Sequence, residues 1–306
     1  MKAKDLKNSI LQMAVEGKLV PQDPNDEPAS VLLERIREEK QRLIAEGKAK
    51  FPKGGESIIY TGSDGSPYEK RVDAKGRVLS EKCIADEIPF EKLPEGWAWA
   101  RLETLALILN GDRGKNYPAK SKLHKSGIPF VSAINIERGG VVTESNMLYL
   151  NESQYEALRA GQLQKGDSVF CIRGSLGKHG VFPFDKGAIA SSLVVVRLIS
   201  SEVLHETYLE LLFDSPLTFI GIRRFNNGTA QPNLAARDFG SFLYALPPLT
   251  EQRRIVERVE ELMPLVEEYG ELEDAREELD AALSGRLRKS VLQMAVQGKL
   301  VPQDPA

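Results

Sequence analysis

The sequence predicts a mixed α+β protein, in which one globular α/β domain is attached to long helices that form a coiled-coil-like spacer. Three observations support this. Strand-like and helix-like runs alternate between residues 93 and 250, and an apolar pattern with three- and four-residue spacing covers residues 251–289. A stretch near the N-terminus also recurs, almost unchanged, at the C-terminus. A length of 306 residues suits one large domain with an appended helical part.

The recurring stretch is the clearest internal feature. Residues 6–24 read LKNSILQMAVEGKLVPQDP, residues 287–305 read LRKSVLQMAVQGKLVPQDP, and 15 of the 19 positions are identical. An offset of 281 residues is too long for a solenoid repeat, so the chain is a unit that ends as it begins. Two units in tandem, or two chains paired about a two-fold axis, would alternate helical segments with middle domains. The alternative interpretation of the repeat is that the same helix-capping sequence occurs twice without functional meaning.

The N-terminal segment, residues 1–47, is expected to form two helices and to pair with the C-terminal repeat, residues 290–306. The first helix should stop at Gly17, because glycine favours the left-handed conformation that ends helices. The second should be capped by Asn25 or Asp26, with Pro28 in its first turn. The apolar faces are Leu6, Ile10 and Met13 in the first helix, and Leu32, Leu33, Ile36, Leu43 and Ile44 in the second.

Residues 48–92 are rich in Gly, Pro, Lys and Asp and predict a long connector with one short hairpin, either as a disordered linker or as an ordered arm. Residues 93–250 predict the globular domain. The expected strands are Ile128–Ile134, Val141–Leu150, Ser168–Ile172, His179–Phe184 and Ala190–Leu198, and the expected helices are Glu152–Ala160, Leu204–Phe213 and Leu217–Phe225.

Residues 251–289 predict a spacer helix on the order of 60 Å long. Pro264 removes one backbone hydrogen bond and should bend it, and Arg276 interrupts its apolar seam. A helix buried in the core of a monomer is the alternative. The seam, which we expect to form a subunit interface, consists of Ile255, Val259, Leu262, Val266, Tyr269, Leu272, Leu279 and Leu283, and it continues to Leu287.

Composition and charge narrow the function classes. The net charge is −3, but residues 97–250 carry +3 (16 basic, 13 acidic) and residues 251–289 carry −5 (7 basic, 12 acidic), a segregation that permits DNA binding. Cys83 and Cys171 are far apart, and CxxC and HExxH motifs are missing, so we expect neither a disulfide framework nor a zinc site. Without an apolar run of about 20 residues or a signal-like N-terminus, we expect a cytoplasmic protein that does not enter a membrane.

Several segments, in the right order, resemble the specificity subunits of Type I restriction-modification enzymes. They are LPEGWAWARLETLA (93–106), GDSVFCIRGSLGKHGVF (166–182), GTAQPNLAARDFGSFLYALPPL (228–249), ALPPLTEQRRIVERVEELM (245–263) and the repeated LQMAVxGKLVPQDP, followed in its first copy by NDEPASVLLERIREEK. Full-length members carry two recognition domains and two conserved helical regions, whereas this chain has one of each and resembles a half-length form.

The resemblance implies a subunit without catalytic residues that reads one half of a bipartite site in double-stranded DNA. It implies binding of a DNA methyltransferase subunit through the conserved helices, and of a restriction/translocase subunit through the assembled complex. Two identical chains should then read a palindromic site. The chain itself would bind no cofactor or metal, and the partner subunits would use S-adenosylmethionine, ATP and Mg.

Three basic or amide-rich segments are candidate DNA-reading loops, namely Asn110–Lys125, Arg173–His179 and Arg223–Gln231. Arginine and lysine recognise guanine and phosphate, and asparagine and glutamine recognise adenine. The alternative is solvated loops, with Gln231 and Asn233 capping the next helix. The candidate residues are Arg113, Lys115, Lys120, Lys122, Lys125, Arg173, Lys178, Arg223, Arg224, Asn226, Asn227 and Gln231.

Catalytic motifs are missing. Leucines flank Pro247–Pro248, so these residues do not form the polar-Pro-Pro-aromatic motif of an adenine methyltransferase, and no dinucleotide or P-loop pattern is present. Glu38–Lys40 spells part of a nuclease motif, but it lies on the polar face of an expected helix. A second hypothesis is a coiled-coil adaptor or decoy that sequesters the methyltransferase subunit. Such a protein should lack the basic loops, which this chain keeps.

Overall fold

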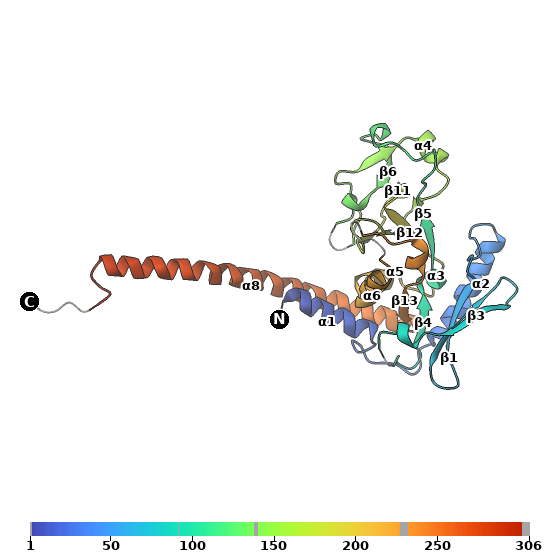
Figure 1. The fold of residues 1–306 in the computed structure, drawn as a ribbon, viewed down its shortest axis with the longest axis horizontal. Coiled ribbons are helices and arrows are strands. Elements are labelled where there is room, and N and C mark those ends of the chain that lie inside the picture. The colour runs from blue at the N-terminus through green and yellow to red at the C-terminus, as the bar shows by residue number, and fades with distance from the viewer. Residues whose placement is uncertain (1, 91, 138–139, 227–231, 302–306) are drawn as a thin grey trace, which may run out of the picture. The chain divides into compact units, whose positions relative to one another are not determined.

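Two four-stranded sheets form the middle part of the chain (Figure 1). The first sheet contains, in spatial order, β10 (His179–Val181), β9 (Ser168–Cys171), β12 (Leu193–Leu198) and β5 (Ala106–Asn110), all antiparallel to their neighbours. The second sheet contains β7 (Leu148–Leu150), β6 (Ile128–Val131), β11 (Lys186–Ile189) and β8 (Gln162–Gln164), and its strands β6 and β11 run parallel.

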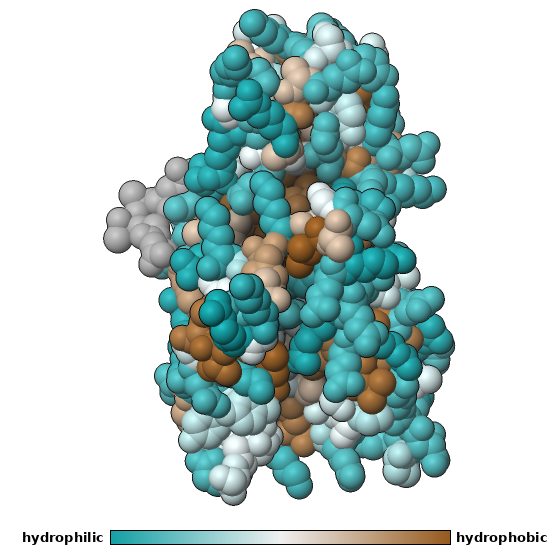
Figure 2. Space-filling view, turned by 90° about the vertical axis from the view of Figure 1, so that its right-hand side faces the viewer, coloured by the Kyte–Doolittle hydropathy of each residue, from teal (hydrophilic) through white to brown (hydrophobic). Residues whose placement is uncertain are grey.

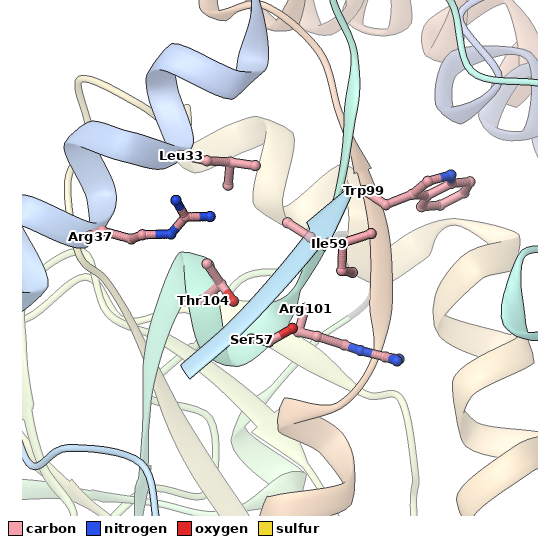
Figure 3. A pocket seen from close by; sticks show the side chains of 8 residues that line it. Leu33, Arg37, Ser57, Ile59, Trp99, Arg101 and Thr104 are labelled. Carbon is pink, nitrogen blue, oxygen red and sulfur yellow. The ribbon is translucent and has the colours of Figure 1, made fainter. Parts of the chain in front are cut away.

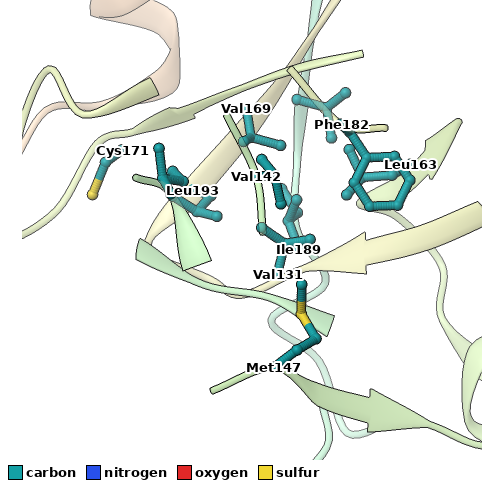
Figure 4. Close-up of a cluster of buried hydrophobic side chains, with 11 residues drawn as sticks. Val131, Val142, Met147, Leu163, Val169, Cys171, Phe182, Ile189 and Leu193 are labelled. Carbon is teal, nitrogen blue, oxygen red and sulfur yellow. The ribbon is translucent and has the colours of Figure 1, made fainter. Parts of the chain in front are cut away.

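The two sheets share one apolar core (Figure 4). Val169 and Val195 of the first sheet and Val131, Leu163 and Ile189 of the second are at most 2% exposed. Aliphatic, largely β-branched side chains suit pleated strands, and their removal from water is the main favourable term of such a core. The computed structural model therefore confirms the mixed α+β fold class.

Helices cover the other face of the first sheet. Phe170 follows Val169 in β9, so it points to the opposite face. Its ring lies 5.2 Å from that of Phe213 and 4.1 Å from that of Phe239, measured between centroids. These partners belong to α5 and α7, and the helices after the first sheet are α5 (Glu206–Asp214), α6 (Pro216–Phe225) and α7 (Ala236–Gly240).

A second cluster covers the outer side of the second sheet. Phe130 and Leu150 pack there with Leu158, and Tyr117 and Leu123 pack against them. The loop that follows β5 is thereby held on the second sheet, together with the short helices η2 (Lys120–Lys122) and α4 (Glu152–Ala157). Its basic side chains stay outside the cluster, since Lys120 and Lys122 are exposed.

The expected strand Val141–Leu150 forms only at its end, as β7. Asn146 has φ of +54°, a left-handed conformation that an extended strand does not contain. The expected strand Ile128–Ile134 is also shorter, because β6 ends at Val131 and the short helix η3 (Ala133–Asn135) follows. Ser132 and Asn135 cap that helix reciprocally, a local hydrogen-bonding option that strand propensity does not register.

Residues 48–92 contain a three-stranded antiparallel sheet, rather than the single hairpin expected from the sequence. We call this sheet the arm; it consists of β1 (Glu56–Thr61), β2 (Pro67–Val72) and β3 (Val78–Cys83) in that order. Gly65 and Gly76, with φ of +79° and +77°, lie in the two turns. Glycine adopts such angles without steric cost, so residues that suggested a flexible connector form tight turns instead.

A buried ion network joins the arm to the middle domain. Arg101, which is 3% exposed, lies 2.7 Å from a carboxylate oxygen of Glu69 and 2.8 Å from one of Glu87 (Nη2 to oxygen). It also donates from Nη1 to the carbonyl of Ser241 at 2.8 Å. Arg71 of β2 adds a 2.7 Å ion pair with Glu103. Buried charges require such complete pairing, so the arm is held as part of the domain.

The same region brings the two ends of the middle domain together. Strand β4 (Ala98–Arg101), followed by the short helix α3 (Leu102–Leu105), pairs antiparallel with β13 (Leu243–Leu246). The helix α8 (Leu249–Val296) starts directly after β13. Burial raises the pKa of the Glu251 carboxyl, and hydrogen bonds from Trp97 Nε1 (2.9 Å) and Gln22 Nε2 (2.6 Å) satisfy it. Gln252 is fully buried and bonds the backbone of Val203, His205 and Pro247.

The N-terminal helices are α1 (Ala3–Val15) and α2 (Ala29–Ala45). Gly17 has φ of +67°, as expected for a helix stop. The expected cap of the second helix is wrong, because Pro28 occupies the N-cap position. Asp26 instead accepts hydrogen bonds from Arg254 Nη2 (2.6 Å) and from the Thr250 hydroxyl. The Asp26 carboxylate therefore binds side chains of α8 and does not cap the backbone N–H groups of α2.

Two compact units make up the chain, residues 11–258 and residues 1–10 together with 259–306. In the second unit, Ala3 N donates to Glu273 Oε2 at 2.9 Å, so the start of α1 lies beside α8. The helix α8 continues through Pro264. The described residues are 2–90, 92–137, 140–226 and 232–301, and none of their helices has the length and apolar character that crossing a bilayer requires.

Among the described residues, the small cavity beside the arm is too small for a ligand. The face in Figure 2 is mostly hydrophilic, with separate apolar patches. The side chains of Leu33, Ser57, Trp99 and Thr104, among others, line a cavity of about 10 Å³ between α2, β1 and β4 (Figure 3). That volume accommodates at most one water molecule, so this place is a packing junction.

Replacing Arg101 by alanine should lower the free energy of unfolding by about 3–5 kcal/mol at pH 7, because Glu69 and Glu87 would remain buried without this cation. Burial raises the pKa of both carboxyls, but hydrogen bonds and nearby cations outweigh it, so each pKa lies below its ordinary value. The wild type should therefore lose this stability as pH falls below about 4, and the difference from Arg101→Ala should shrink.

Urea titrations across this pH range measure the effect. The control is Arg77→Ala, which removes an exposed ion pair with Asp73 and should leave the unfolding midpoint nearly unchanged. A loss for Arg101→Ala no larger than that of the control would contradict the role of the network.

Candidate nucleic-acid interface

Parts of the three predicted loops meet at the end of β9. Arg173 pairs with Asn233 in an antiparallel bridge, and its Nε donates to Asn233 Oδ1 at 3.1 Å. The backbone N–H of Asn233 donates to Asn226 Oδ1 at 3.2 Å. Arg113 donates from Nη2 to the carbonyl of Ser191 at 3.3 Å. We call Arg113, Arg173, Asn226 and Asn233 the arginine–asparagine cluster; all four are exposed.

Backbone geometry explains why Arg173 stands at this place. It follows the buried residues Cys171 and Ile172 directly, and the turn after it contains Gly174 and Gly177 with φ of +77° and +84°. Ile172 N donates to the carbonyl of Ser192, and Gly174 N donates to that of Pro232. A rigid strand therefore ends in an arginine whose guanidinium reaches the surface, as in binding loops on rigid scaffolds.

The electrostatics of the cluster favour an anion. Partial desolvation, and then the positive charge of Arg173, lower the pKa of Arg113. The charge of Arg173 thus acts against the charge of Arg113, and a bound anion would relieve this repulsion. The nearby Asp112 stays ionised, because backbone N–H groups of Arg159 and Gly114 donate to it and lower its pKa. Through these two hydrogen bonds, the Asp112 carboxylate holds the loop that carries Arg113 in its conformation.

Several predicted residues have protein partners. Lys178 donates from Nζ to the carbonyl of Ala133 at 2.7 Å, so its ammonium supports the loop after β6. Arg224 pairs with Glu87 at 3.4 Å and lies over the Phe225 ring. Arg223 is exposed on the last turn of α6. Asn227 and Gln231 lie outside the described residues.

The predicted lysines form another exposed group. Lys115, Lys120, Lys122 and Lys125 are all exposed. The carbonyl of Lys122 accepts a hydrogen bond from Gln154 Nε2 at 2.8 Å, which ties this group to α4. Lysine charges presented on a loop suit phosphate attraction rather than base reading.

Sequence reasoning missed Asn233, which was considered only as a helix cap. The cap of α7 is Ala235, and Asn233 orients Arg173 instead. The sequence does show that Asn233 carries an amide and lies close to the amide residues of the third loop. Its partner, Arg173, becomes apparent only when the two distant segments pair in the fold. The described residues contain no group of three His, Cys, Asp or Glu side chains that could hold a metal ion.

The predicted seam on α8 divides into two parts. Ile255 and Val266 are already buried within this chain, and Val259 and Leu262 are partly buried. The first two are therefore not available to another subunit, which corrects their assignment to a subunit interface. The exposed part is Tyr269, Leu272, Leu279 and Leu283, with exposures of 39%, 65%, 61% and 59%.

Comparisons with known proteins agree on one family. The profile described as Type I restriction modification DNA specificity domain matches residues 94–269. The Type I restriction enzyme EcoAI specificity subunit of Escherichia coli is 32% identical over 267 residues, which cover 84% of this chain and 39% of that protein. The EcoEI specificity subunit of Escherichia coli is 30% identical over 343 residues, covering 99% and 52%.

Among solved structures, the HsdS subunit from Thermoanaerobacter tengcongensis covers 89% of this chain at 21% identity, with a TM-score of 0.48, and the match covers 57% of that chain. This chain spans roughly half the length of the curated relatives that it matches. The family profile covers more than half of the chain, including both sheets, the arginine–asparagine cluster and the start of α8. The chain therefore belongs to the family of Type I restriction-modification DNA specificity subunits.

Proposed function

We propose that this chain reads one half-site of a bipartite sequence in double-stranded DNA and recruits a methyltransferase subunit and a restriction/translocase subunit to it. The observation that carries this proposal is the arginine–asparagine cluster. Asn233 is hydrogen-bonded to Arg173 and Asn226. Arg113 bonds the carbonyl of Ser191, whose neighbour Ser192 accepts from the N–H of Ile172. Chemistry would belong to the partner subunits, which would use S-adenosylmethionine, ATP and Mg. The chain itself would bind no cofactor.

The cluster has the chemistry that base reading requires. A guanidinium group donates two hydrogen bonds to O6 and N7 of guanine, and an amide bonds N6 and N7 of adenine. Arg173 is held by Asn233 through Nε, so its terminal nitrogens can meet a base edge in a defined orientation. Arg113 has a single protein acceptor among the hydrogen bonds of the described residues, and its remaining donors suit a base or a phosphate.

The lysine group would supply the nonspecific part of binding. Lys115, Lys120, Lys122 and Lys125 are exposed on one loop, and Asp112 at its start is buried. Cations that neutralise phosphates release counterions, which makes affinity salt-dependent but carries no sequence information. The lysine group would thus position the chain on the phosphate backbone, and the arginine–asparagine cluster would read the bases.

The second half of α8 would pair two chains. Leu265, Leu272, Leu279, Leu283 and Leu287 recur at spacings of seven, seven, four and four, so they share one side of the helix. We call this side the leucine face; its members are 59–65% exposed. Exposed apolar rows of this kind mark protein interfaces. Two identical chains joined about a two-fold axis would read a palindromic bipartite site.

The adaptor or decoy hypothesis has no observation in its favour. The relatives are specificity subunits of restriction enzymes, and the exposed arginines and lysines provide a surface that a protein without a DNA role does not need. A decoy would still bind a methyltransferase subunit, so DNA modification is the property that separates the two hypotheses.

Coexpression with the methyltransferase subunit of its own system, followed by mapping of modified adenines, tests the proposed function. We expect modification at two mirror-related half-sites and none from the chain alone. Modification that is indifferent to base order, or that occurs without the partner, would contradict the proposal.

Arg173→Ala and Arg113→Ala should each weaken specific DNA binding by the assembled complex about tenfold, because each removes a cation and up to two hydrogen bonds. Affinity is measured by fluorescence anisotropy over a range of salt. If Arg113 contacts a phosphate, its variant should also lower the salt slope by about one. Arg77→Ala, the same change on the arm, should bind as the wild type does. Equal affinities for all three variants would exclude the cluster from the DNA interface.

Replacing Leu272 and Leu279 together by glutamate should prevent chain pairing, because four added charges would face one another across a two-fold interface. Light scattering should report a monomer, and methylation should be lost, while circular dichroism shows a folded middle domain. The control is Ala281→Glu, an exposed position on the opposite side of the helix. A double variant that pairs and methylates normally would show that α8 is not the interface.

A further inference from the structure

We call residues 6–24 the N-terminal copy of the repeated sequence and residues 287–305 the C-terminal copy. Where the structure describes both, over residues 6–20 and 287–301, the two copies adopt the same local structure. Each helix ends before a glycine in the left-handed conformation, with φ of +67° at Gly17 and +65° at Gly298. The same backbone hydrogen bond follows in each, from Lys18 N to the Met13 carbonyl (2.8 Å) and from Lys299 N to the Met294 carbonyl (2.9 Å). The sequence thus encodes one helix end twice.

The surroundings of the two copies differ. In the N-terminal copy Leu11 is 2% exposed and Val15 is 0% exposed. Their counterparts in the C-terminal copy are Leu292, at 58%, and Val296, at 88%. Because the side chains are identical, the sequence does not account for the difference. The C-terminal copy presents an apolar face that its twin buries.

The site that holds the N-terminal copy is defined by close contacts within residues 11–258. A Cβ on Gly17 would lie 2.4 Å from Pro94 Cγ and 3.1 Å from Trp97 Cζ2, so only glycine allows this approach. Gln22 Nε2 donates to Glu251 Oε1 at 2.6 Å. We call Pro94, Trp97 and Glu251 the acceptor.

We propose that the acceptor has two alternative occupants, and that in a pair of chains the C-terminal copy of one chain docks on the acceptor of the other in place of its N-terminal copy. This inference rests on the pairing of chains in the proposed function. The residues at the contacts have counterparts of the same type, because Gly298 and Gln303 stand where Gly17 and Gln22 stand. The docked helix would bury the face that carries Leu292 and Val296.

Tandem connectivity supports this exchange. If two such units followed one another in a single chain, one copy of the repeat would both end the first unit and begin the second. That shared copy would fill the acceptor of the second unit. Docking in trans rebuilds that connection without a covalent link. Once the leucine faces hold two chains together, the C-terminal copy is present at a high effective concentration and competes with the N-terminal copy.

The two copies are not equivalent ligands. The N-terminal copy has Ile10 where the C-terminal copy has Val291, so it presents one more methylene group. It also has Glu16, which bonds Lys18 within the copy, where the C-terminal copy has Gln297. These differences favour binding of the N-terminal copy to the acceptor in a free chain. The exchange would therefore occur only when two chains are paired.

Identical substitutions at matched positions test the proposal. Val296→Asp places a charge on the face that would dock, and it should raise the dissociation constant of the pair at least tenfold in sedimentation equilibrium of the full chain. Ser290→Asp adds the same charge at a position whose counterpart, Ser9, stays exposed in the N-terminal copy, so it should remain within twofold of the wild type. If Val296→Asp behaves like Ser290→Asp, the proposal is overturned.

A cross-linking measurement does not depend on the effect of a substitution on folding. A photoreactive residue at Lys299, in a mixture of ¹⁴N- and ¹⁵N-labelled chains, should cross-link to the peptide around Trp97 of the other chain. In the unpaired chain, the same probe at Lys18 should reach that peptide within its own chain. Cross-links from Lys299 only to other peptides would overturn the proposal.

Failure of the exchange is distinguishable from failure of the proposed function. If Leu272→Glu with Leu279→Glu yields a monomer while Val296→Asp pairs normally, the leucine face pairs the chains and the exchange alone is wrong. If the wild-type chain is monomeric at all concentrations, pairing itself fails, and the exchange fails with it.

Discussion

The fold depends on the neutralisation of one buried cation. Arg101 lies on β4, where the chain enters the middle domain, and almost none of its surface is exposed. A buried guanidinium needs anionic and carbonyl acceptors on several sides, and Glu69, Glu87 and the Ser241 carbonyl supply them from three distant parts of the chain. Arg101 therefore links the arm to the place where β4 pairs with β13.

This constraint places the ends of the middle domain together. Because β4 pairs with β13, the helix α8 starts beside the strand through which the domain begins. Glu251 and Gln252 at the start of α8 bind Trp97, Gln22 and the backbone near His205. The segment around Glu251 and Gln252 thus has a structural role. It joins the N-terminal segment, the domain and the helix at one point.

The candidate reading surface follows from the same rigidity. Arg173 extends from a strand whose neighbours are buried in the shared core, and Asn233 holds its Nε from another segment. An arginine held in this way loses little freedom when it binds, which favours specificity. Lysines on the loop after β5 lack such a frame and suit phosphates. Similarity to specificity subunits and the geometry of this cluster both support the proposed reading of DNA.

The sequence by itself determined the fold class, the family, the helix end at Gly17 and the long C-terminal helix, because these depend on local periodicity, glycine conformation and ordered motifs. Tertiary structure decided what depends on partners distant in sequence. Residues 48–92 contain an arm, rather than a flexible connector, and Glu69 of this arm pairs with the distant Arg101. Asp26 bonds Arg254 rather than capping α2. Asn233 joins the site only when its segment meets Arg173, since no periodicity encodes a pairing across 60 residues.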